Sequence, residues 1–256
     1  MTSFEAVTRL GFAARGLMYG AIGWLAFRSG RTENPGGILL YLATGPGAVL
    51  VAIMAAGFFS YAAWRFCEAW LDREQHGSDA KGIAVRLAGA GSGLIHLGFG
   101  AAAILAAVHA RRAGGGGHAQ QTGTAIALSI PGGVVLVYLG AAILAGVGLH
   151  QFRKAWTAKF MRRLDGSGVA RGWICWLGRA GYAARGAVFL TMAWLLVHAA
   201  QARSPAEAGG IDAALGSLPR LAQIAVAAGI VLFGLFSLAE ARFRRIPAAR
   251  RLRSHR

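Results

Sequence analysis

The sequence predicts an all-α membrane protein, in which six transmembrane helices form three tandem two-helix repeats in a pseudo-threefold bundle. Three observations support this fold class: long apolar stretches, charge gathered between them, and internal similarity. Of the 256 residues, 55% are apolar and 14% are charged, and the mean hydropathy is +0.49. A soluble domain carries about 25% charged residues, so the composition excludes an ordinary soluble protein. The hydrophobicity also excludes intrinsic disorder.

Six stretches have the apolar composition and the length, about 20 residues, of a membrane-spanning helix. Strands of a membrane barrel alternate apolar and polar residues, and these stretches do not alternate, so helices are expected. The predicted spans are Leu10–Phe27, Gly47–Phe66, Leu87–Val108, Gly132–Leu149, Trp176–Val197 and Leu221–Leu238.

Most of the 27 lysines and arginines fall on one side of these spans. That side holds both termini and the segments after the second and fourth spans. The positive-inside rule therefore places both termini in the cytoplasm. Cys67 and Cys175 fall at the same edge, where thiols stay reduced, so no disulfide is predicted. The opposite side holds Arg28, Arg31, Arg111, Arg112, Arg203 and Arg220.

Comparing the sequence with itself reveals a two-helix unit that occurs three times. Arg9-Leu-Gly-Phe-Ala-Ala-Arg-Gly opens the first span, and Arg179-Ala-Gly-Tyr-Ala-Ala-Arg-Gly opens the fifth. Residues 86–93 open the third span with a weaker copy, and the even-numbered spans repeat every 86 residues. Units of two helices share one orientation, which predicts a symmetry axis along the membrane normal. Within a single membrane domain, the predicted repeats are 7–74, 84–164 and 177–246, followed by a basic tail at 247–256.

This pattern resembles a bacterial integral membrane family, the domain of unknown function numbered 1206. The family is described as three tandem two-helix units, each opening with a motif similar to Arg-x-Gly-Tyr-x-Ala-Arg-Gly, which residues 9–16 and 179–186 carry. The middle copy departs from it, because Ser92 replaces the second arginine and His96 stands where the other copies have an aromatic ring. The resemblance implies a bacterial inner (cytoplasmic) membrane protein of six helices, and it implies no activity.

Four charged residues near the cytoplasmic helix ends are candidate clamps. Arg15 and Arg185 lie near helix N-termini, whereas Glu68 and Glu240 lie near helix C-termini, so each charge opposes the helix macrodipole. An ion pair between an arginine and a glutamate would offset the unfavourable interaction of each charge with its helix dipole. We therefore predict the pairs Arg15–Glu68 and Arg185–Glu240, or crossed pairs between units. The alternative is that both guanidinium groups extend back to the lipid headgroups.

His96 falls in the middle of a predicted span and is the candidate intramembrane polar site. Binding haem would require two histidines at equal depth on facing helices. His109 and His198 share a depth, but His96 has no partner at its own level. A buried histidine that hydrogen-bonds a neighbouring helix is the alternative. We expect no cofactor and no metal site.

No motif of a known catalytic site occurs in the sequence, so a non-enzymatic protein is predicted. The acidic residues lie in loops or at helix ends, unlike those of carriers driven by protons or sodium. One candidate function is a small pore or carrier along the pseudo-threefold axis, and the alternative is a membrane scaffold or lipid-interacting structural protein. A haem-binding redox subunit is a third. A continuous polar cavity would favour the pore, and an axis closed by apolar side chains would favour the scaffold.

The lipid bilayer is the expected partner, with anionic lipids at the cytoplasmic face attracting the basic segments. Binding to nucleic acid is not expected, and no protein partner is indicated. On the opposite side, Ile38–Ala43 and Ile211–Leu215 are predicted to form short interfacial helices. After the fourth span, apolar residues recur every four positions among basic ones, which predicts an amphipathic helix at the lipid surface. These residues are Phe152, Trp156, Phe160 and Leu164.

Overall fold

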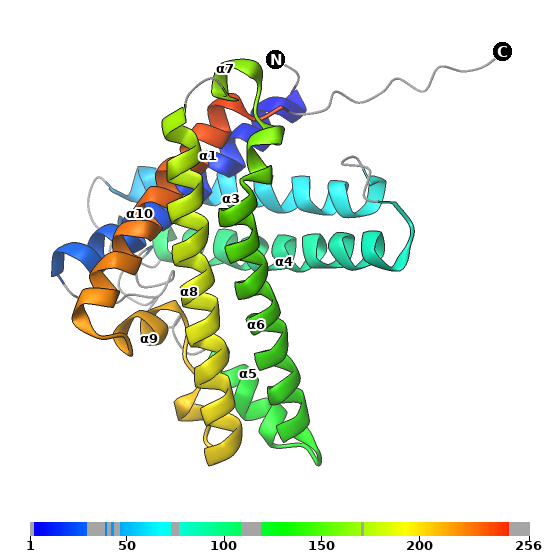
Figure 1. Cartoon of the computed structure of the whole chain (residues 1–256), viewed down its shortest axis with the longest axis vertical. Coiled ribbons are helices and arrows are strands. Elements are labelled where there is room, and N and C mark those ends of the chain that lie inside the picture. The colour runs from blue at the N-terminus through cyan, green and yellow to red at the C-terminus, as the bar shows by residue number, and fades with distance from the viewer. Residues whose placement is uncertain are drawn as a thin grey trace.

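Six long helices dominate the computed structural model, which describes residues 3–29, 39, 42–43, 47–72, 77–108, 119–169 and 172–245 (Figure 1). They are α1 (Ser3–Ser29), α3 (Gly47–Leu71), α4 (Ala80–Val108), α6 (Gly133–Thr157), α8 (Gly172–Ala202) and α10 (Arg220–Phe243). Each contains a stretch long and apolar enough to cross a membrane. The six predicted spans are therefore confirmed, and the described part of the chain contains no β-strand.

Short helices lie in several of the connections between the long ones. On the side opposite the basic segments, α9 (Ile211–Gly216) confirms that the predicted segment forms a short helix, and its interfacial position stays a prediction. Three of the six residues of its counterpart at 38–43 lie outside the described residues. α5 (Ala119–Leu128) was not predicted, because its 10 residues are too few for a membrane span. The remaining short elements are η2 (Lys159–Arg163), α7 (Gly166–Val169) and η3 (Pro205–Glu207).

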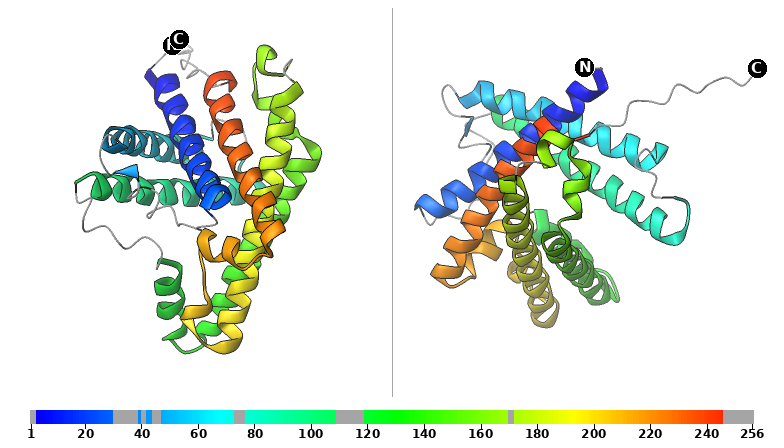
Figure 2. Two further views of the ribbon diagram at one scale, coloured as in Figure 1. Left: turned by 90° about the vertical axis from the view of Figure 1, so that its left-hand side faces the viewer. Right: turned by 45° about the horizontal axis from the view of Figure 1, so that its top comes forward.

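The long helices pack in the order α4, α3, α1, α10, α8, α6. Both views of Figure 2 show α1 and α10 side by side, and Figure 1 shows α3 and α4 crossing the direction of α6 and α8. Between units, α3 packs on α4, α6 on α8 and α10 on α1. Within units, α1 packs on α3 and α8 on α10, but α4 and α6 do not form a packed pair in the described part. The array is thus open at the middle unit, and the predicted pseudo-threefold bundle is not confirmed.

A glycine explains why the middle unit differs from the other two. A Cβ added to Gly57 of α3 would lie 2.3 Å from Cβ of Ala14 in α1, and one added to Gly229 of α10 would lie 2.5 Å from Cβ of Ala184 in α8. Small residues let membrane helices approach closely. The corresponding residue of α6 is Ile143, which is 66% exposed. The middle unit therefore lacks the glycine that brings the two helices of each other unit together.

The main core lies between the four inner helices, α1, α3, α8 and α10, and includes Met18, Met54, Met192 and Ile230. The candidate spans of α4 and α6 are only 28% and 22% buried, compared with 44–50% for the inner four. Each outer helix buries one narrow stripe of mostly small residues, chiefly against the one long helix that it contacts. The remaining apolar surface of α4 and α6 is available to lipid.

The predicted amphipathic helix after the fourth span is wrong. α6 itself continues to Thr157, and the backbone then turns at Ala158, whose φ is 47°. Beyond this turn, Phe160 and Leu164 are buried in a cluster with residues of α8 and α10, whereas Trp156 is 85% exposed. The period of four residues therefore spans two different environments, a lipid-facing helix and a buried connection.

Candidate functional site

The first arginine of each repeat motif binds the C-terminal end of the long helix of another unit that packs against its own helix. Arg9 caps α10, Arg86 caps α3 and Arg179 caps α6. The last carbonyl groups of a helix lack intrahelical partners and carry partial negative charge. A guanidinium group supplies both the hydrogen-bond donors and the positive charge that complement them. The bonds run from Arg9 Nη1 to the carbonyl oxygens of Ala241 and Arg242 (2.7 and 2.6 Å), from Arg86 Nε and Nη2 to those of Ala69 and Trp70 (2.7 and 3.1 Å), and from Arg179 Nη2 to that of Trp156 (3.4 Å).

The last glycine of the motif sets how closely the same helices approach. A Cβ on Gly16 of α1 would lie 2.8 Å from the carbonyl oxygen of Gly234 in α10, and one on Gly186 of α8 would lie 3.1 Å from that of Gly148 in α6. In α4 the corresponding Gly93 faces a side chain, Phe66 of α3, at 3.0 Å. The α10–α1 and α6–α8 junctions therefore share one geometry, and they place the second arginine of the motif at matching positions.

At the α10–α1 junction this second arginine is Arg15, the centre of a buried polar network. Arg15 is 8% exposed and Glu240 is 2% exposed. Arg15 Nη2 donates to Glu240 Oε2 at 2.5 Å, Nη1 donates to Tyr61 Oη at 3.0 Å, and Nε donates to Ser237 Oγ at 3.2 Å. Glu240 Oε1 accepts a second bond from Arg244 Nη1 at 2.7 Å. All three Arg15 nitrogens are bonded, and the Glu240 carboxylate lies between two guanidinium groups.

Of the four predicted clamp residues, the structure brings Arg15 and Glu240 together as one of the crossed pairs between units. Arg15 does not bond Glu68, which is 1% exposed and lies 3.7 Å from Arg65 Nη1 of its own helix. The reason is the packing order: α10, not α3, presents its glycine face to Gly16.

The fourth clamp residue, Arg185, lies among aromatic rings. Its guanidinium carbon is 4.5 Å from the ring centre of Phe233 and 5.1 Å from that of Tyr19. Lys154 of α6 lies nearby, with Nζ 5.4 Å from the ring centre of Tyr182. Cations within about 6 Å of an aromatic centre are attracted to the ring face. Neither Arg185 nor Lys154 has a carboxylate within 4 Å in the described part of the chain.

His96 is 8% exposed and bonds its own helix rather than a neighbouring one. Its Nδ1 lies 2.7 Å from the carbonyl oxygen of Ser92, and a carbonyl only accepts, so Nδ1 donates the proton. The imidazole packs 4.3 Å from the Tyr61 ring, next to the hydroxyl that receives the Arg15 bond. His96 therefore supports the network through Tyr61.

No group of three or more histidine, cysteine, aspartate or glutamate side chains in the described residues is placed to hold a metal ion. Cys67 and Cys175 are both free. Of the two histidines predicted at equal depth, His198 packs against Trp194, and His109 lies outside the described residues.

Sequence reasoning missed three members of the network: Tyr61, Ser237 and Arg244. Ser237 and Arg244 stand three residues before and four residues after Glu240, so helical spacing places all three on one face. That spacing was a usable signal. Tyr61 gave none, because its contact with Arg15 depends on how α1 and α3 pack.

The connection after α6 holds Arg244 in place. Leu164 and Arg244 form an isolated antiparallel bridge. On either side of it, the Asp165 amide donates to the Phe243 carbonyl and the Arg245 amide donates to the Arg163 carbonyl, both at 2.8 Å. The middle unit thereby contributes to a network whose charged residues belong to the first and third units.

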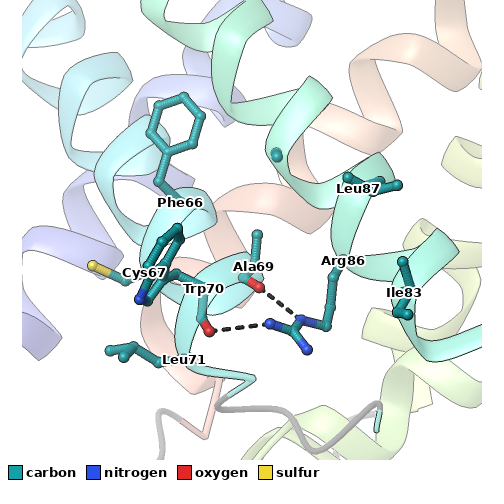
Figure 3. Close-up of a pocket in the computed structure, with 9 residues that line it drawn as sticks. Phe66, Cys67, Ala69, Trp70, Leu71, Ile83, Arg86 and Leu87 are labelled. Atoms are coloured by element: carbon teal, nitrogen blue, oxygen red, sulfur yellow. Dashed lines mark hydrogen bonds between the residues drawn. The ribbon is translucent and has the colours of Figure 1, made fainter. Parts of the chain in front are cut away.

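A groove of about 630 Å³ lies between the end of α3 and the start of α4 (Figure 3). Its lining is mainly apolar, including Phe66, Trp70 and Leu87, and Trp70 is 84% exposed. Figure 3 shows Arg86 at this groove, with its guanidinium bonded to the carbonyl oxygens that end α3. The groove combines apolar walls with one fixed positive charge.

Three segments of the chain, residues 10–72, 87–158 and 180–244, match the Domain of Unknown Function DUF1206. The chain belongs to the DUF1206 family. Each DUF1206 match begins one residue after a capping arginine, so family recognition and structural repeat coincide. The uncharacterised protein YxxB of Bacillus subtilis is 30% identical over 243 residues, which cover 90% of this chain and 87% of that relative. No solved structure matches the chain.

Proposed function

We propose that this DUF1206 protein is a non-enzymatic scaffold of a bacterial inner membrane that binds lipid along its outer helices and anionic lipid at its basic side. The closed packing of the inner helices carries this proposal. The space beside Arg185, enclosed by Tyr19, Phe189 and Ile230 among others, is about 20 Å³. That volume holds about one water molecule, so this space among the described residues is too small to serve as part of an ion path.

Lipid contact is supported by the outer surface. α4 and α6 carry large exposed apolar side chains, and the groove at Trp70 has apolar walls beside Arg86. Basic residues near a membrane surface each gain about 1 kcal/mol from anionic lipid. The basic segments therefore favour the cytoplasmic leaflet, with both termini in the cytoplasm. Fluorescent-protein fusions to each terminus test this orientation, and export of either terminus would overturn it.

A flux assay separates the scaffold from a pore. The purified full chain is reconstituted into liposomes loaded with chloride or potassium reporters. We expect leakage equal to that of protein-free vesicles, and selective flux of either ion would contradict the scaffold.

Lipid enrichment tests the second half of the proposal. Native mass spectrometry of nanodisc-derived protein is expected to show more phosphatidylglycerol retained than phosphatidylcholine. Replacing the exposed Arg153, Lys159 and Arg162 with Gln removes basic charge and is expected to reduce that preference. A matched variant with Arg203→Gln and Arg220→Gln on the opposite side is expected to leave it unchanged. Equal retention of both lipids would contradict the proposal.

A small anion pore or carrier is the second candidate, and one observation favours it. Among the described residues of the network and its surroundings, cations outnumber carboxylates, so positive charge exceeds negative charge inside this part of the array. The cations include Arg15, Arg65, Lys154, Arg185 and Arg244, and the carboxylates are Glu68 and Glu240. Chloride flux that falls in an Arg185→Gln variant would support this candidate.

A further inference from the structure

Repeat equivalence identifies one position where the structure has two cations in place of an ion pair. At the α10–α1 junction, the second arginine of the motif, Arg15, binds Glu240. The residue equivalent to Arg15 at the α6–α8 junction is Arg185, and the residue equivalent to Glu240 is Lys154. Lys154 thus occupies the place of the carboxylate.

The two junctions are comparable in geometry as well as in sequence. Gly16 meets the Gly234 carbonyl at the first, and Gly186 meets the Gly148 carbonyl at the second. Glu240 lies six residues beyond Gly234, and Lys154 lies six residues beyond Gly148. The shared spacing gives Lys154 and Arg185 the positions of Glu240 and Arg15. Lys154 packs on the Tyr182 ring and Arg185 on the Phe233 ring, and the centres of these two rings are 5.4 Å apart.

The surroundings do not neutralise this pair of cations. Arg185 and Lys154 contact the aromatic rings of Phe233 and Tyr182. Glu240, the carboxylate of the adjacent network, has its two oxygens bonded to Arg15 and Arg244. Two cations partly removed from water on a membrane helix pair are costly without a counter-ion. Both side chains keep partial exposure, so a ligand can reach them.

We propose that Lys154 and Arg185 bind an anion of the phosphate or carboxylate class between α6 and α8. The ligand supplies the negative charge that Glu240 supplies at the α10–α1 junction. A guanidinium group suits such an anion because it donates two parallel hydrogen bonds, and an ammonium group adds a point charge. A free phosphate and the phosphate of a lipid headgroup share this chemistry. The site is separate from the scaffold role, which assigns anionic lipid to exposed basic residues such as Arg153, Lys159 and Arg162.

Thermal unfolding of the purified full chain, in a neutral detergent, tests the site in two arms. One arm adds inorganic phosphate, and the other adds phosphatidylglycerol to the micelles. Ligand that binds only the folded state raises the Tm as its concentration rises. We expect a saturable rise in at least one arm, and the arm that responds identifies the source of the anion. No rise in either arm would overturn the proposal.

Variants assign the effect to this pair. Lys154→Glu recreates the pairing of Arg15 with Glu240, so we expect a higher Tm without ligand and no further rise with it. Arg203→Glu makes the same change of charge at an exposed position on the side opposite the basic segments and is expected to keep the ligand response. Lys154→Gln covers the case in which the charge reversal fails to fold; it is expected to weaken binding about tenfold, as loss of one charged hydrogen bond does. An unchanged response in Lys154→Gln, or equal loss in Arg203→Glu, would overturn the assignment.

Discussion

Arg15 and Glu240 stand 225 positions apart in the sequence, and their side chains meet at 2.5 Å where both are buried. The contact joins the first long helix to the last one. A buried ion pair costs desolvation and is favourable only when its remaining hydrogen-bonding groups are satisfied. Tyr61, Ser237 and Arg244 satisfy them here. We interpret the network as the feature that selects α10 as the neighbour of α1.

Glu240→Gln is the sharpest test of that interpretation. The substitution removes the negative charge and leaves Arg15 and Arg244 buried without a counter-ion, which we expect to lower the free energy of unfolding by about 3 kcal/mol. Denaturant unfolding in mixed micelles measures the change. Glu207→Gln, at an exposed position, is the matched control and should shift it by about 0.5 kcal/mol or less. Equal effects of the two substitutions would contradict a stabilising pair.

Gly16→Ala tests the close approach of α1 and α10. The added Cβ would lie 2.8 Å from the Gly234 carbonyl oxygen, and such overpacking costs about 1–3 kcal/mol. Gly20→Ala is the control one turn further along α1, where a Cβ meets nothing within 4 Å. Alanine favours a helix over glycine by about 1 kcal/mol, so this control should be neutral or stabilising in a thermal unfolding series. If Gly20→Ala were destabilised as much as Gly16→Ala, the close contact between α1 and α10 would not be specific to Gly16, and the prediction would be wrong.

The spans and repeats were predictable because they depend on local properties. Each span is a continuous apolar stretch, and each unit opens with a motif that recurs at the same helix position. The choice of Glu240 over Glu68 as the partner of Arg15 was not predictable. Both glutamates occupy the same position in the second helix of their unit, so the repeat itself cannot distinguish them. Only the packing order of the helices does so.

The lack of packing between α4 and α6 in the middle unit could not be predicted from the sequence for a different reason. The eight-residue motif recurs, if weakly, at 86–93, so the three units were expected to pack alike. The difference lies in the second helix of each unit, where Ile143 of α6 stands at the position of Gly57 in α3 and Gly229 in α10. A single side chain at a helix–helix contact outweighs the similarity of the rest of the unit, because small residues set how closely membrane helices pack.

Ile143→Ala compared with Gly57→Ala tests the open arrangement. Ile143 is 66% exposed, so shortening it should change the free energy of unfolding by about 0.5 kcal/mol or less. Gly57→Ala places a Cβ 2.3 Å from that of Ala14 and should cost about 1–3 kcal/mol. Thermal unfolding of both variants makes the comparison. If Ile143→Ala costs several kcal/mol, Ile143 is buried in the folded protein and α4 packs on α6.

Arg86→Gln tests whether the first arginine of the motif stabilises the C-terminal end of the neighbouring helix, α3, and not its own helix, α4. The substitution removes a guanidinium group from the carbonyl oxygens of Ala69 and Trp70, and a cation at a helix C-terminus contributes about 1 kcal/mol. Hydrogen exchange should therefore become about fivefold faster in the last turn of α3, with little change at the start of α4. Lys81→Gln removes the same charge from an exposed position of α4 and should leave α3 unaffected. Faster exchange confined to α4 would show that Arg86 stabilises only its own helix, and the capping role would have to be abandoned at this junction.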